Sequence, residues 1–283
     1  MVYNELLSEI SLIANDLQER EIMIAEESAF YTKIDDSEMS ADYLGRHLGL
    51  INSANEAKVA KMCKKIYTRY HQELPAVEPT VSFLSTRFKG PDKDDWHKFK
   101  RLMCWIKKTK TDVRIIGADD LLNMIVIIDC THAVYDDMRG HTGGITSYGT
   151  GIIDEKSSKQ KMNTRSSTET EHGGTSEYLP KPIFFELFME AQAYKPNIIL
   201  TKDNESEIRM LVNGKASCTS NSKHVTIKYF WCTDRIKQGN ISVCHCPTEK
   251  MIADYMSKPL QGKVFITFRN VIMGWVHDID FQQ

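Results

Sequence analysis

Residues 124–129 read MIVIID, a short apolar run rich in β-branched side chains that ends in a carboxylate. Such a run is typical of a buried β-strand, because β-branched side chains pack well on a pleated surface. Residues 144–153 then alternate with glycines, and residues 158–163 alternate polar and apolar side chains. We therefore expect three strands joined as a meander, and a boundary between two parts of the chain near residue 120.

A helical stretch follows the three expected strands. Residues 166–169 (SSTE) fit a capping box, in which a hydroxyl and a carboxylate bind the free amides at the start of a helix. The glycine pair at 173–174 and the prolines Pro180 and Pro182 indicate two helices rather than one. The further elements are expected as a strand at 197–200, helices at 205–212 and 223–236, a strand at 240–246 and a helix at 249–256. This order of elements predicts a chain of the α+β class.

The composition is that of an ordinary globular protein. The 283 residues are 41% hydrophobic and 26% charged, with a net charge of −2. No apolar run approaches the length of about 18 residues that a transmembrane helix needs, and the acidic residues 1–30 are unlike a signal peptide. The seven cysteines are an odd number and are scattered along the chain, which favours free thiols in a reducing compartment. We expect an intracellular protein, in the cytoplasm, the nucleus or both, with no membrane contact.

The sequence before residue 120 favours helices and includes a basic segment. Apolar residues follow a helical spacing within residues 6–17, and residues 76–79 read as a loop. Asp94 or Asp95 can cap the next helix, whose apolar stripe consists of Trp96, Phe99, Leu102, Met103 and Ile106. Its opposite face is basic and carries Lys98, Lys100, Arg101, Lys107 and Lys108. A face of this kind either contacts phosphates or is simply solvated, and charge alone leaves both interpretations open.

Acidic residues stand where strands of the expected sheet end. Asp129 directly follows one apolar strand, and Asp203 follows another. If these strands are parallel neighbours, both carboxylates emerge at the same edge of the sheet. Glu171 lies in the first turns of the helix between them, and Asp254 lies in the last expected helix. Converging carboxylates repel one another unless a cation neutralises them, and oxygen ligands suit Mg²⁺ or Mn²⁺. Each acid taken alone is more often a surface or capping residue, and it is their joint placement that favours a metal site.

Several short blocks of sequence stand in a characteristic order between residues 120 and 274. They are Ile128-Asp129-Cys130, residues 137–144 (DMRGHTGG), 158–161 (SKQK) and 166–171 (SSTETE), Asp203-Asn204, and residues 223–229 (KHVTIKY) and 253–260 (ADYMSKPL). Together they resemble the RNase H domain of copia-type retrotransposon polyproteins. Residues 81–85 and 96–98, and also residues 42–45, look like the end of the reverse transcriptase that precedes this domain in the family.

The resemblance implies a fold and a domain organisation. Residues 120–275 would form an RNase H-like domain, a mixed five-stranded sheet with flanking helices. A small, mostly helical remnant of the reverse transcriptase would precede it at residues 1–119, and residues 276–283 would form a tail.

The resemblance also implies a site. The catalytic and metal-binding residues would be Asp129, Glu171, Asp203 and Asp254, which together would hold two Mg²⁺ or Mn²⁺ ions about 3.5–4 Å apart. The substrate would be the RNA strand of an RNA–DNA hybrid, recognised through its 2′-hydroxyl groups. The basic face of the helix near residues 96–106, rather than the resemblance, suggests Lys98, Arg101 and Lys107 as the nucleic-acid contacts. The rest of the reverse transcriptase is an expected partner.

Some features depart from the family pattern. Residues 117–120 (GADD) look like the Tyr-x-Asp-Asp turn of a polymerase, but glycine replaces the tyrosine and the family has a linker here. We interpret this segment as a loop and expect no polymerase site in the chain. Residues 247–250 lack the histidine that cellular RNase H enzymes carry in this loop, as the copia-type pattern also does, which favours modest turnover. Two alternatives therefore stay open, an inactive nucleic-acid-binding relic and a structural connection module.

A zinc site is not expected at Cys244-His245-Cys246. Neighbouring residues on a strand point to opposite faces of the sheet, so these three side chains are divided between the two faces. No second pair of ligands stands at the spacing of a zinc finger.

Overall fold

The computed structural model describes residues 75–87, 91–109, 111–214, 226–239 and 241–277. The helix expected within residues 6–17 and the block at 42–45 lie outside these ranges. The same holds for the start of the block at 223–229 and for the side chain of Lys107.

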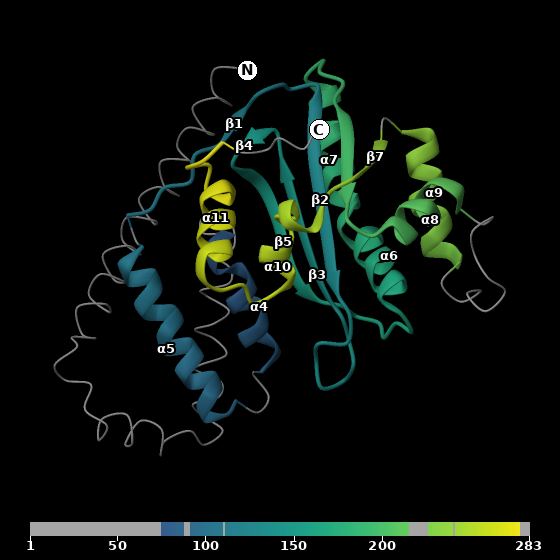
Figure 1. The fold of residues 1–283 in the computed structure, drawn as a ribbon. Helices are drawn as coiled ribbons and strands as arrows, with labels where there is room; N and C mark the ends of the chain where they lie inside the picture. Colours follow the sequence, from purple (N-terminus) through teal and green to yellow (C-terminus); the bar gives the residue numbers. More distant parts are fainter. Residues whose placement is uncertain (1–74, 88–90, 110, 215–225, 240, 278–283) are drawn as a thin grey trace, which may run out of the picture.

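A mixed five-stranded sheet forms the centre of the fold (Figure 1). Its spatial order is β5 (Ile152–Lys159), β3 (His141–Ser147), β2 (Asn123–Thr131), β6 (Asn197–Lys202) and β7 (Ile241–His245). Neighbours among the first three strands are antiparallel, whereas β6 runs parallel to both β2 and β7. A separate two-stranded ladder joins β1 (Gly117–Ala118) to β4 (Gly149–Thr150). The predicted mixed five-stranded sheet is confirmed.

Helices cover both faces of the sheet (Figure 1). One face carries α6 (Ser167–Tyr178), α7 (Pro180–Ala191), α8 (Glu205–Asn213) and α9 (Thr226–Gln238). The other carries η1 (Pro75–Val77), α4 (Glu78–Thr86), α5 (Lys93–Lys108), η4 (Thr248–Lys250), α10 (Asp254–Ser257) and α11 (Gly262–Ile272).

Strand β2 separates two hydrophobic cores because its side chains alternate between the faces. Val126 and Ile128 pack with residues of α6, α8 and α9 in one core. Ile127 packs in the other core, which contains Leu102 of α5 and Ile272 of α11. Residues 75–109 therefore share a core with the sheet and with the last helix.

The second and third strands differ from the expected boundaries. The glycine-rich run at 144–153 is not one strand, because the chain reverses direction inside it. Gly149 (φ 130°) and Gly151 (φ 66°) adopt backbone angles that side chains with a Cβ rarely tolerate, so they make this reversal possible. The third long strand is consequently 152–159, and the expected strand at 158–163 is wrong apart from its first two residues.

The predicted helix starts are partly correct. Ser166 caps α6 as expected, accepting a hydrogen bond from the Glu169 amide, but the Glu169 carboxylate binds the Arg165 amide instead of completing the box. For α5, the cap is Asp92, and Asp95 is the third residue of that capping box. The expectation that Asp94 or Asp95 caps this helix is therefore wrong.

The helical stretch after the meander does divide in two, as predicted. The break falls at Leu179, just before Pro180, while the glycine pair at 173–174 lies inside α6. The helix expected at 249–256 is wrong, since this stretch contains the turn η4 and only the start of the short helix α10. Helix α11 was not predicted, and no side chain caps its start.

Candidate metal centre

The parallel pairing of β2 with β6 brings two carboxylates to one edge of the sheet. Ile127 of β2 stands opposite Thr201 of β6 in this ladder. Asp129 lies two residues after Ile127, and Asp203 lies two residues after Thr201. Asp129 is buried within the last part of β2, where it pairs with Gly143 of β3. Asp203 directly follows β6 and is partly exposed. The arrangement inferred from parallel neighbouring strands is therefore present.

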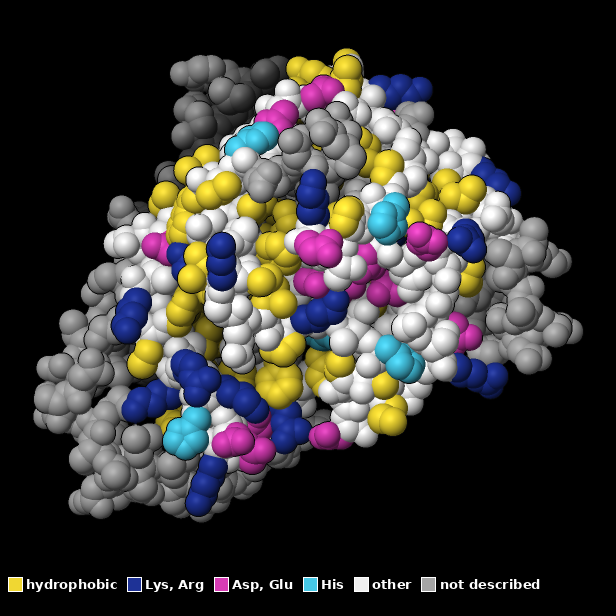
Figure 2. Space-filling view, in the orientation of Figure 1, with side chains coloured by type: hydrophobic (Ala, Val, Ile, Leu, Met, Phe, Trp, Pro, Cys, Tyr) yellow, Lys and Arg dark blue, Asp and Glu magenta, His cyan; other side chains and the backbone are white. Residues whose placement is uncertain are grey.

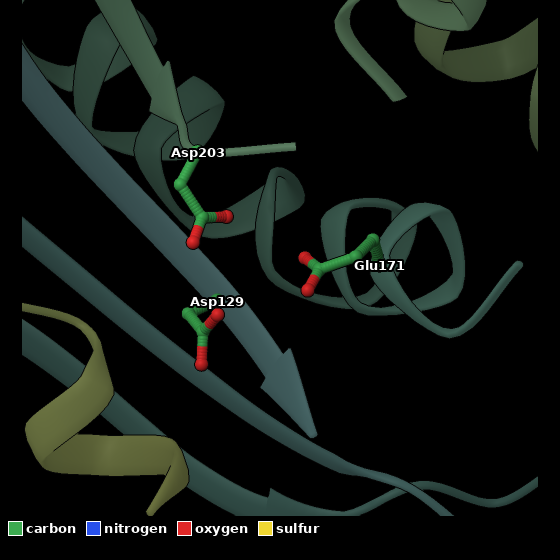
Figure 3. A group of neighbouring side chains, drawn as sticks. All are labelled: Asp129, Glu171 and Asp203. Carbon is green, nitrogen blue, oxygen red and sulfur yellow. The ribbon is translucent and has the colours of Figure 1, made fainter. Parts of the chain in front are cut away.

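Glu171 reaches the same place from helix α6. Its Oε1 accepts a hydrogen bond of 3.2 Å from the backbone amide of Cys130, the residue after Asp129. One carboxylate oxygen from each of Asp129, Glu171 and Asp203 lies within 4.8 Å of the other two. Figure 3 shows the three carboxylates directed toward a common space, one from β2, one from α6 and one from the end of β6.

Asp254 lies beside this cluster rather than within it. Its Oδ1 is 2.6 Å from the Lys258 ammonium, and the same ammonium lies 3.5 Å from Oδ2 of Asp129. The hydroxyl of Ser257 also donates a hydrogen bond to Oδ2 of Asp129. The short helix α10 therefore attaches to the cluster through Asp129, and Lys258 bridges Asp129 and Asp254.

The cluster places acidic groups where ionisation is costly. Burial raises the pKa of Glu171 to about 7, with Asp129 and Glu207 acting in the same direction and the Lys202 ammonium opposing them. Burial also raises the pKa of Asp254 to about 6, where Lys258 opposes the shift and Asp129 adds to it. A bound cation would favour the ionised forms of both groups. The available donors are carboxylate oxygens, which fit a hard divalent cation such as Mg²⁺ or Mn²⁺.

Lys202 is part of this site and was missed in the sequence. Its side chain is fully buried, and its Nζ lies 2.7 Å from Oε2 of Glu171 and 2.7 Å from Oε2 of Glu207. Burial alone would lower the pKa of Lys202, but these two carboxylates raise it well above the usual value. The available signal was a lysine at the end of an apolar strand, next to Asp203.

The basic residues of α5 lie apart from the carboxylates. Lys98 is partly exposed, 3.7 Å from Asp95 and above the ring of Phe83, and Arg101 is exposed. Figure 2 shows Lys and Arg side chains gathered over α5 at the lower left, and acidic side chains near the middle of the same face. The structure does not bring the basic residues and the acids into one cluster.

Two further motifs, residues 117–120 and Cys244-His245-Cys246, were not expected to form sites, and their surroundings are ordinary. Asp119 pairs with His277 at 2.8 Å, and Asp120 accepts a hydrogen bond from the Leu122 amide in the turn before β2. Cys244 and His245 are both exposed at the end of β7, whereas Cys246 is buried just after the strand, so the three side chains do not divide by the strand alternation expected from the sequence. Within the described ranges, neither motif belongs to a group of three side chains that could hold a metal.

Comparison with known proteins finds relatives among transposon polyproteins. The chain is 23% identical over 193 residues to the retrovirus-related Pol polyprotein from transposon TNT 1-94 of Nicotiana tabacum, and 27% identical over 202 residues to that from transposon RE2 of Arabidopsis thaliana. Its homologues are retrovirus-related Pol polyproteins. The matched parts cover 68% and 70% of this chain but only 14% of each Pol polyprotein. No family model matches the chain.

The mixed five-stranded sheet with flanking helices, which the resemblance implied, is present in this chain. Among solved structures, LC11-RNase H1 from compost is similar with a TM-score of 0.38 and 15% identity, over 48% of this chain and 92% of that one. In the part of the chain that the structure describes, no helix combines the length and apolar character needed to cross a membrane.

Proposed function

We propose that this chain is the RNase H part of a copia-type retrotransposon Pol polyprotein and hydrolyses the RNA strand of RNA–DNA hybrids with divalent cations. The observation that carries the proposal is the convergence of Asp129, Glu171 and Asp203 at the ends of two parallel strands and a helix. The homology to Pol polyproteins supports the same assignment.

Four carboxylates would hold the metal. Asp129 takes the central position, since it belongs to the three-carboxylate cluster and also shares Lys258 with Asp254. Glu171 and Asp203 would bind on one side of Asp129, and Asp254 on the other. When bound, a pair of Mg²⁺ or Mn²⁺ ions supplies Lewis-acid chemistry that activates water and stabilises the departing oxygen.

The chain's own groups would orient the reaction. The Cys130 amide holds Glu171, and the Ser257 hydroxyl holds Asp129, so neither carboxylate is free to rotate away from the common space. Lys98, Arg101 and Lys107 on α5 would bind backbone phosphates of the hybrid. Such contacts position a duplex without reading its sequence.

An inactive nucleic-acid-binding relic is the second candidate, and one observation favours it. Glu171 and Asp254 each form a short ion pair with a lysine, and Lys258 also lies 3.5 Å from Asp129, so three of the four acids already have a cation beside them. In this alternative the chain binds hybrids without cutting them. The structural connection module, which needs its polymerase partner, would neither bind nor cut alone.

Cleavage of a labelled RNA–DNA hybrid by the purified full chain tests the proposal. We expect cutting with Mg²⁺ or Mn²⁺ and none with a chelator. Asp203→Asn removes one charged ligand with little change in shape, and we expect it to reduce the rate at least about 100-fold. The matched control is Asp120→Asn, at the opposite end of β2, which should cut like the wild type.

Two results would contradict the proposal. One is cutting that survives the chelator, and the other is equal rates for Asp203→Asn and Asp120→Asn. Binding of the hybrid without cutting, by a chain whose circular dichroism shows that it is folded, would favour the relic.

A further inference from the structure

A buried unit of charged side chains lies directly behind the carboxylate cluster. It consists of Lys202 at the end of β6, Glu207 in the first turn of α8, and Glu171 in α6. Lys202 and Glu207 have no exposed surface, and Glu171 is 5% exposed. The ammonium contacts both carboxylates at the same distance, 2.7 Å.

The remaining contacts of this unit fix its geometry. The hydroxyl of Thr175, one turn after Glu171 in α6, donates a hydrogen bond of 2.6 Å to Oε1 of Glu207 and lies 3.4 Å from the Lys202 ammonium. Asn204 caps α8 and thereby holds Glu207 in position. A charge buried so completely is very costly unless it is paired, so Lys202 and Glu207 depend on each other.

Lys202 and Glu207 together add no net charge to the site, but they determine where positive charge lies. Lys202 on its own would bind Glu171 and compete with any divalent cation for that carboxylate. Glu207 draws the same ammonium toward itself and shares its charge. The strength with which Glu171 can bind a cation then depends on the balance between these two contacts.

We propose that Lys202 and Glu207 form a counter-charge pair that positions Glu171 and sets the affinity of this site for a divalent cation. Lys202 weakens binding of the cation, and Glu207 restores it. Both are positioning residues, because they act through Glu171. This inference rests on the proposed divalent-cation site and assigns it a determinant outside the four acids.

Opposite effects of the two single substitutions are the signature of this role. Lys202→Met removes the competing ammonium and should tighten Mn²⁺ binding about tenfold, whereas Glu207→Gln leaves the ammonium to Glu171 alone and should weaken it about tenfold. The double variant Lys202→Met/Glu207→Gln removes both charges and retains the acceptor for Thr175. Its affinity should return to within about threefold of the wild type.

Mn²⁺ binding to the full chain, measured by calorimetry and by the electron paramagnetic resonance of free Mn²⁺, tests this proposal without turnover. Lys181→Met is the matched control, because Lys181 pairs with Asp154 on the surface and should leave Mn²⁺ affinity unchanged. Lys202→Met leaves two buried carboxylates without their cation and can fail to fold. In that case Glu207→Gln and the double variant decide the outcome.

A purely structural role for the pair predicts a different pattern. Both single variants would then lower the free energy of unfolding without shifting Mn²⁺ affinity in opposite directions, and this would overturn the proposal. Unchanged affinity in Glu207→Gln, or no Mn²⁺ binding by the wild type, would overturn it as well. Hybrid cleavage is scored separately, so a chain that shows the opposite shifts but cuts nothing refutes only the proposed function.

Discussion

His141 at the start of β3 is a buried histidine with a partner on each ring nitrogen. Nδ1 lies 2.6 Å from the Tyr135 hydroxyl, and Nε2 lies 2.8 Å from the Ser157 hydroxyl. Burial lowers the pKa of His141 from 6.5 to about 4, against the opposing effects of the Met256 backbone and of Asp129. The folded chain therefore keeps this ring neutral at a pH where the unfolded chain protonates it.

This difference makes stability depend on pH in a defined direction. Below pH 6.5 the unfolded state binds a proton that the folded state does not, so the stability contributed by neutral His141 is lost as the pH falls toward 4. Between pH 7.5 and pH 4, the wild type should lose about 2–3 kcal/mol more free energy of unfolding than His141→Asn does. Urea unfolding at both pH values measures this difference.

The exposed His245 provides the control for this experiment. His245→Asn should lose as much stability as the wild type over the same pH interval. Equal losses in the wild type and in His141→Asn would show that the ring of His141 is not kept neutral by burial. Comparing the three proteins over one pH interval also removes the contributions of Glu171 and Asp254 to the change in stability, because these carboxylates titrate in all three.

At the residue scale, the sequence contained the acids of the site but not their partners. Asp129 and Asp203 could be predicted because each ends an apolar strand, and parallel pairing then leaves them adjacent. Lys202 could not, since its role depends on Glu171, which reaches it from a helix distant in sequence, as well as on Glu207 in the helix that follows β6. Local patterns do not report which helices will enclose a strand end.

Close packing of α6 against the sheet depends on a glycine in β3. A Cβ at Gly144 would lie 2.6 Å from the ring of Tyr178, which is fully buried and also bonds the Thr146 hydroxyl. The ring belongs to α6, the helix that carries Glu171. Gly173 in the same helix differs, because nothing lies within 4 Å of a Cβ built there.

These two glycines should respond oppositely to alanine. Gly144→Ala forces the Tyr178 ring to move and should lower the free energy of unfolding by about 1–3 kcal/mol. Gly173→Ala fills open space in a helix and should raise it by about 0.5–1 kcal/mol, because alanine loses less conformational freedom on folding. Thermal or urea unfolding followed by circular dichroism compares the two variants directly. If Gly144→Ala is as stable as the wild type, the described packing of α6 on β3 is wrong.

Helix α5 offers a separate prediction about hybrid binding. Alanine at Lys98, Arg101 and Lys107 together should reduce the dependence of hybrid affinity on salt, by about one unit in the slope of log K against log salt for each lost phosphate contact. Fluorescence anisotropy with a labelled hybrid in a chelator, from low to moderate salt, measures this slope.

The control for α5 lies on the other face of the sheet. Alanine at Lys181, Arg209 and Lys237, on α7, α8 and α9, removes the same amount of positive charge. If both triple variants have the wild-type slope, α5 does not contact phosphates. If both lower it equally, the effect is one of net charge and not of this helix.

At the element scale, whether a segment forms a strand or a helix was easier to predict than where that element begins and ends. The strands expected at 124–128 and 197–200 are correct, because short apolar runs rich in β-branched side chains are typical of buried strands. The turn at 148–151 was missed because glycines also occur inside strands, and only the backbone angles show that they reverse the chain. The stretch at 249–256 has helical spacing, but it folds as separate turns that place Asp254 beside Asp129.

At the scale of the whole molecule, the two cores explain how distant segments support one site. The core beneath α10 combines residues of η1, α4 and α5 with others from the sheet and from α11. Tyr255, next to Asp254, donates a hydrogen bond of 2.9 Å to the carbonyl of Ala76. The segment before residue 120 therefore contacts the helix that carries the fourth acid, which no local pattern in the sequence indicated.

Strand-specific cleavage tests the central claim most directly. The full chain is given an RNA–DNA hybrid labelled on either strand, together with RNA–RNA and DNA–DNA duplexes of the same sequence, in Mg²⁺ and in Mn²⁺. We expect cutting of the RNA strand of the hybrid alone, because RNA is selected by its 2′-hydroxyls within a hybrid duplex. Cutting of the DNA strand, or equal cutting of all three duplexes, would contradict the account.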